Sequence, residues 1–93
     1  MKNMQKEVFV GSIVYSKAGR DRGKCYIIVR FDEKGYAFVA NGEEKSVLAP
    51  KRKNVKHLDL SGDRNDVIGD KFLEGKQVFD SEIKSALRAY SGK

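Results

Sequence analysis

Residues 17–24 are the part of this chain whose residue types most clearly suggest a binding function. They contain four cations, one carboxylate and two glycines, and they lie between two apolar runs, residues 13–15 and 25–29. Both runs are rich in β-branched and aromatic residues, which predicts two strands joined by a turn. A tight, cationic turn that projects from a rigid sheet would hold several positive charges close to a phosphate backbone. Binding of RNA or DNA is therefore the first hypothesis.

A second basic cluster follows Pro50, and the charge of the whole chain is uneven. Residues 1–60 hold 13 Lys and Arg against 7 Asp and Glu, whereas residues 61–93 hold six of each. The entire excess of +6 therefore belongs to the first part of the chain, as expected of a localised anion-binding face. The candidate phosphate contacts in the two clusters are Lys17, Arg20, Arg22 and Lys24, and Lys51, Arg52, Lys53 and Lys56.

Three strand tyrosines offer a second kind of contact. Tyr15, Tyr26 and Tyr36 would stack on unpaired bases if their rings faced outward. A small β domain also needs large side chains in its core, and this placement is the favoured one for all three.

Motifs for catalysis and metal binding fail in detail. Residues 19–24 approach a phosphate-binding loop of nucleotide hydrolases, but three residues instead of four separate Gly19 from Gly23, and Cys25 follows Lys24 where Ser or Thr is required. The one histidine, His57, lies far in sequence from the one cysteine, so no standard zinc spacing exists. We expect no enzymatic activity, no catalytic residues, no metal site and no cofactor.

The elements that must position the basic residues follow from apolar patterning and turn signals. Five short strands in about 50 residues predict a mainly β fold, a small five-stranded barrel. Asn41-Gly42 predicts a two-residue hairpin turn, and residues 51–54 are expected to form a basic loop. The predicted strands are residues 12–16, 24 to about 31, 36–40, 44–48 and 55–60.

The remaining third of the chain is expected to be helical. Residues 61–63 are predicted as a linker and residues 66–73 as a helix that Gly69 weakens. Apolar side chains at helical spacing predict an amphipathic helix over residues 81–90. Residues 25–29 are apolar at successive positions, so both faces of that strand should be covered, one of them by this C-terminal segment.

Length and composition favour one monomeric domain, with the barrel at about residues 9–60 and a helical extension at 61–93. No apolar run approaches the roughly 20 residues that span a membrane. The first residues lack the pattern of a signal peptide, and the single cysteine cannot form an internal disulfide. We therefore expect a cytoplasmic protein with no membrane partner.

Residues 11–29 resemble a KOW motif, which consists of a strand, a basic loop with a glycine, and a second strand. Gly23 stands at the place of the characteristic glycine. Residues 31–42, 51–54 and 57–58 look like the larger KOW-type ribosomal proteins of archaea and eukaryotes, and still more like a short family of bacterial KOW-domain RNA-binding proteins. Residues 80–90 are similar to the C-terminal helix of that short family.

This resemblance implies an SH3-like barrel that binds ribosomal RNA or another structured RNA, and association with the ribosome. The RNA-facing positions would be Lys17, Arg20, Arg22 and Lys24 around Gly23; charge alone adds residues 51–53 and Lys56. An alternative remains open: a protein–protein interaction module of the transcription or translation machinery. Its basic loops would meet an acidic protein surface, and its tyrosines would form a peptide groove.

Overall fold

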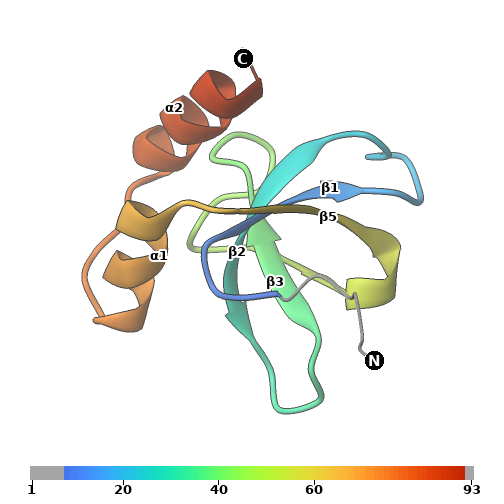
Figure 1. The fold of residues 1–93 in the computed structure, drawn as a ribbon, viewed down its shortest axis with the longest axis horizontal. Helices are drawn as coiled ribbons and strands as arrows, with labels where there is room; N and C mark the ends of the chain where they lie inside the picture. The colour runs from blue at the N-terminus through green and yellow to red at the C-terminus, as the bar shows by residue number, and fades with distance from the viewer. Residues whose placement is uncertain (1–7, 92–93) are drawn as a thin grey trace.

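A five-stranded antiparallel sheet and two helices make up residues 8–91, the part of the chain that the computed structural model describes (Figure 1). The strands are β1 (Ser12–Ser16), β2 (Cys25–Phe31), β3 (Ala37–Ala40), β4 (Lys51–Lys53) and β5 (Leu58–Arg64). A 3-10 turn, η1 (Val55–His57), links β4 to β5, and the helices are α1 (Asp66–Leu73) and α2 (Asp80–Ser91).

The strand order is β4-β3-β2-β1-β5, so the first strand lies inside the sheet, between the second and the last. Every neighbouring pair is antiparallel, and β-bulges interrupt the register of β1 with β5 and of β2 with β3. The mainly β, five-stranded character is confirmed. The first strand has the predicted bounds, and the second and third begin one residue later than predicted.

The predicted fourth strand, residues 44–48, is wrong, and so is the predicted hairpin turn at Asn41-Gly42. The side-chain Oδ1 of Asn41 accepts hydrogen bonds from the backbone N–H groups of Glu43 and Lys45, both at 3.0 Å. The backbone N–H of Val47 donates to Asp80 Oδ1 at 2.7 Å. Side chains thus take up backbone groups that a strand would have paired.

The basic segment after Pro50 also differs from the prediction. Residues 51–53, expected to be a loop, form β4, so Pro50 precedes a strand and does not end one. The predicted strand at residues 55–60 begins later, because the side chain of Asn54 accepts from the N–H of Lys56 and caps η1. The predicted linker at residues 61–63 is part of β5.

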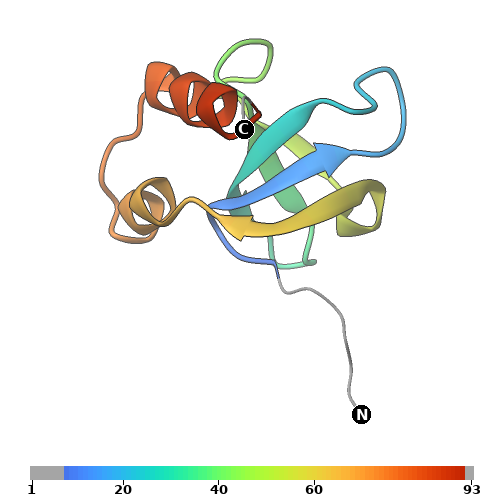
Figure 2. The ribbon, with the colours of Figure 1, turned by 45° about the horizontal axis from the view of Figure 1, so that its top comes forward.

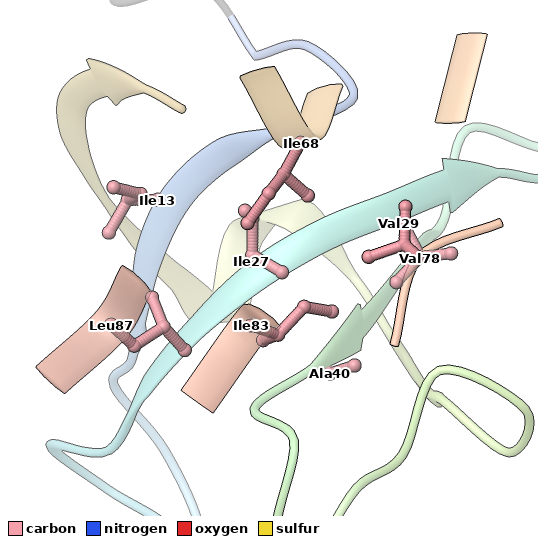
Figure 3. Packing of buried hydrophobic residues seen from close by; sticks show 8 residues of the cluster. All are labelled: Ile13, Ile27, Val29, Ala40, Ile68, Val78, Ile83 and Leu87. Atoms are coloured by element: carbon pink, nitrogen blue, oxygen red, sulfur yellow. The ribbon is translucent and has the colours of Figure 1, made fainter. Parts of the chain in front are cut away.

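Both helices lie where the sequence predicts them, α1 with identical bounds and α2 one residue longer at each end. They pack together on one face of the sheet (Figures 1 and 2). The core on this face, shown in Figure 3, consists of Ile13, Ile27, Val29, Ala40, Ile68, Val78, Ile83 and Leu87.

The other face of the curled sheet has its own core, formed by Val14, Tyr26, Ile28, Ala37, Val39 and Leu58. Strand β2 contributes to both cores, as the successive apolar residues at 25–29 predict. The strand is therefore held on both sides, and the turn that precedes it is anchored to a rigid element.

Candidate functional site

Asp21 brings the two basic segments together. It lies in the β1–β2 turn, and its side chain is only 10% exposed. Its Oδ1 accepts from Ser16 Oγ at 2.9 Å, and its Oδ2 accepts from the Tyr26 hydroxyl at 2.9 Å. From β4, Lys53 Nζ lies 3.3 Å from Oδ1, and Lys51 Nζ lies 3.4 Å from Oδ2. One carboxylate thus connects three strands.

The shape of the turn explains why Asp21 points inward and its neighbours outward. Gly19 and Gly23 have φ of +84° and +88°, which L side chains rarely adopt. The N–H of Gly23 donates to Ser16 O at 2.7 Å, and the N–H of Arg22 donates to Gly19 O at 3.3 Å. These bonds close the turn, while Arg20 and Arg22 remain exposed on either side of the buried carboxylate.

Burial and hydrogen bonding shift the pKa values of two groups in this cluster, Asp21 and Tyr26. Burial by itself would raise the pKa of Asp21, but hydrogen bonds from Tyr26 and Ser16 and the charge of Lys53 hold it well below its usual range. Burial, together with the hydrogen bond to Asp21, raises the pKa of Tyr26. At neutral pH the cluster therefore contains a carboxylate and a neutral phenol, and the side chain of Lys53, which is 8% exposed, lies against the carboxylate.

The β1–β2 turn and η1, which carry four of the predicted phosphate contacts, lie at the end of the molecule opposite the helices (Figure 2). Lys51 joins them, because its Nζ lies 3.4 Å from Oδ2 of Asp21 in that turn. The N–H of Lys17 donates to His57 O at 3.0 Å, which joins the β1–β2 turn to η1. Within residues 8–91, Arg20, Arg22 and Lys56 have no carboxylate oxygen within 4.0 Å. We call this set the tip surface, and it consists of Lys17, Arg20, Arg22, Lys51 and Lys56.

Two members of the tip surface are partly neutralised. Lys17 Nζ lies 3.8 Å from Asp59 Oδ1, and both side chains are largely exposed. Lys51 shares Asp21 with Lys53 but keeps 39% of its side chain exposed. Both contacts are longer than a close hydrogen bond, so both ammonium groups remain accessible to a competing anion.

Three other predicted contacts, Lys53, Lys24 and Gly23, have structural roles within the protein. Lys53 is buried against Ser16 Oγ at 2.7 Å and is withdrawn from any external phosphate. Lys24 Nζ lies 2.6 and 2.7 Å from the two carboxylate oxygens of Glu44. Gly23 contributes through its left-handed backbone alone, since a Cβ there would meet no atom within 4 Å.

The tyrosines divide between the core and the surface. Tyr26 is fully buried, as favoured for the strand tyrosines, and Tyr15 is half-buried. Tyr36 is half-buried beneath Arg52, whose Cζ lies 3.8 Å from the ring centroid. Sequence reasoning missed a matching pair, Arg30 over Phe38, also at 3.8 Å. Only the register of β2 with β3 places these two residues opposite each other.

No model of a known protein family matches the chain. Between residues 8 and 91, no three or more His, Cys, Asp and Glu side chains are grouped in a way that could hold a metal ion. Neither helix of that part of the chain is long and apolar enough to cross a membrane. Function therefore has to be inferred from the charge and geometry of the site.

Proposed function

We propose that this chain is an RNA-binding protein that contacts the phosphate backbone of ribosomal RNA, or another structured RNA of the ribosome, through its tip surface. One observation carries the proposal. The only carboxylate of the β1–β2 turn, Asp21, is committed inward to Tyr26 and Lys53, so it does not neutralise the exposed Arg20 and Arg22. A cytoplasmic location and a monomeric state are parts of the same proposal.

The chemistry of the tip surface suits phosphate. A guanidinium presents a planar fork of N–H donors that matches two phosphate oxygens at once, and it stays charged at any physiological pH. Three to five phosphate contacts would lower log K by about 0.7–0.9 per contact for each unit of log salt concentration. Such contacts position the protein on the RNA by charge and shape and do not read base sequence.

The topology supports the SH3-like KOW barrel as the finer description of the fold. β4 and β5 lie at opposite edges of the sheet, yet Lys53 of β4 reaches Ser16 at the end of β1 at 2.7 Å. The sheet is therefore curled strongly enough to bring β4 close to the end of β1, the strand next to β5. The basic turn between β1 and β2 is the loop of the KOW resemblance.

The proposal is tested by the double variant Arg20→Ala/Arg22→Ala. Affinity for a hairpin of ribosomal RNA is measured by fluorescence anisotropy over a range of salt concentrations. We expect weaker binding and a salt slope whose magnitude falls by about 1.4–1.8, because two phosphate contacts are lost. Far-ultraviolet circular dichroism should remain unchanged, since neither side chain packs in the core.

Lys24→Ala is the matched control, because it removes a cation of the same turn that is already paired with Glu44. Its salt slope should stay much closer to that of the wild type. If the double variant binds with unaltered affinity and slope, the tip surface is not the RNA contact.

A protein partner is the second candidate, and one observation favours it. Leu48 is 96% exposed and Phe79 is 55% exposed, and both line an open cavity of about 380 Å³ beside α2. Such a patch is typical of a protein interaction site. A partner that remains bound after nuclease treatment, and that Leu48→Glu releases, would favour this function over RNA binding.

A further inference from the structure

Two arginines place their guanidinium carbons over aromatic rings on one face of β2, β3 and β4. We call this group the arginine–aromatic strip, and it consists of Arg30, Tyr36, Phe38 and Arg52. Arg30 pairs with Phe38 across β2 and β3, and Phe38 pairs with Arg52 across β3 and β4. Paired residues project from the same face of a sheet. Each guanidinium carbon lies 3.8 Å from the centroid of a ring, Arg30 over Phe38 and Arg52 over Tyr36.

The strip continues the face that the helices cover. Ala40 is packed in the core beneath the helices, and Phe38 lies two residues earlier on the same face of β3. Phe38 is only half-buried, and Arg30 and Arg52 are exposed. This part of the sheet is thus left open where the neighbouring part is covered.

Both guanidinium groups are held in place, but only that of Arg52 has a carboxylate partner among residues 8–91. Arg52 Nε donates to Asp32 Oδ2 at 2.8 Å, which fixes the group through one nitrogen. Arg30 has no carboxylate oxygen within 4.0 Å anywhere in residues 8–91, so the ring of Phe38 is what orients it. A planar cation held against a ring has a second face on which another flat group can stack. Its orientation is fixed in advance, which lowers the entropic cost of binding.

We propose that the arginine–aromatic strip binds unpaired bases of a single-stranded RNA segment, which stack on the guanidinium planes of Arg30 and Arg52. This inference rests on the proposed function, because the tip surface would hold the phosphates of the same RNA. The two surfaces differ in kind: the strip offers flat cations backed by rings, and the tip offers exposed cations. Stacking uses the flat face that every base has, so the strip tolerates any sequence.

Strand spacing selects single strands over duplexes. Arg30 and Arg52 lie on strands separated by β3, so their backbones are about 10 Å apart at the usual 4.7–4.9 Å between strands. Bases stacked in a helix are only about 3.4 Å apart. Two bases can reach both platforms only if they are splayed, which unpaired RNA permits and a duplex does not.

The test is the double variant Arg30→Lys/Arg52→Lys, which keeps both charges and removes both planes. Binding is measured with a short single-stranded RNA and with an RNA duplex of the same sequence. We expect at least about fivefold weaker binding of the single strand, since each stacked base contributes about 1–3 kcal/mol. Affinity for the duplex and both salt slopes should not change. Phe38→Leu, which removes one ring but leaves an apolar side chain, should also weaken only the single strand, but by less, because Arg52 over Tyr36 remains.

Variants at the tip separate this inference from the proposed function. Arg20→Ala/Arg22→Ala should weaken both probes and flatten both salt slopes. If the wild type binds neither probe, the proposed function and the strip fail together. If the tip variant weakens both probes while Arg30→Lys/Arg52→Lys leaves the single strand bound as tightly as before, the strip is overturned and the proposed function stands. The proposal for the strip is also overturned if Arg30→Lys/Arg52→Lys weakens binding of the single strand and of the duplex equally.

Discussion

Residues 17–24 and β4 are both rich in cations, and the structure uses them in opposite ways. Arg20 and Arg22 are exposed at the turn, whereas Lys53 of β4 is buried beside Asp21 and Ser16. The difference arises from one carboxylate. Because Asp21 points into the molecule, it gathers the lysines of β4, and the arginines beside it have no carboxylate partner among residues 8–91. The number of cations in a segment therefore does not give the charge that it offers to a ligand.

Replacing Asp21 should have the largest effect on the difference between the buried and the exposed cations. Asp21→Asn would keep the shape of the side chain but leave the ammonium of Lys53 buried without a counter-charge. We expect the free energy of unfolding to fall by about 3–5 kcal/mol, the usual cost of removing one partner from a buried ion pair. Urea unfolding, followed by circular dichroism, measures it. The double variant Asp21→Asn/Lys53→Met should recover part of the loss, because it removes the stranded charge as well.

Glu44→Gln is the matched control, because it breaks an exposed ion pair where Asp21→Asn breaks a buried one. It breaks the ion pair with Lys24, in which both side chains are largely exposed. Exposed pairs contribute little, so the loss of stability should be far smaller than for Asp21→Asn. Equal losses for the two variants would show that burial is not what separates the two kinds of cation.

Local patterning was enough to predict the elements with strong apolar signals. The bounds of β1 and α1 agree with the prediction, because β-branched runs and helical spacing act over a few residues. β4 was not predicted, since Lys-Arg-Lys contains none of the residues that favour strands and becomes a strand by pairing with β3. Its alternation then has a clear role, with Lys51 and Lys53 directed to Asp21 and Arg52 directed to Tyr36.

The candidate site was predictable to a similar extent. Glycines and charges in residues 17–24 suffice to expect an exposed cationic turn, and Arg20 and Arg22 fit that expectation. The burial of Lys53 was not predictable, because its partner lies 32 positions earlier in the chain. The pair of Arg30 with Phe38 was equally hidden, because a bulge in β2 sets the register that places them opposite each other. Long-range contacts of this kind leave no trace in local sequence.

Lowering the pH also removes the charge of Asp21, by protonating its carboxylate. Its pKa in the folded protein lies below the value of about 3.9 in an unfolded chain, so its stabilising effect is complete above about pH 5 and is lost as the pH falls further. Asp21→Asn lacks this group. The difference in free energy of unfolding between wild type and variant should therefore shrink as the pH is lowered from about 5 to about 2. The remaining carboxylates titrate in both proteins and cancel in the difference. Urea unfolding at each pH measures it, and a difference that stays constant would mean that Asp21 holds the lysines through its shape and not through its charge.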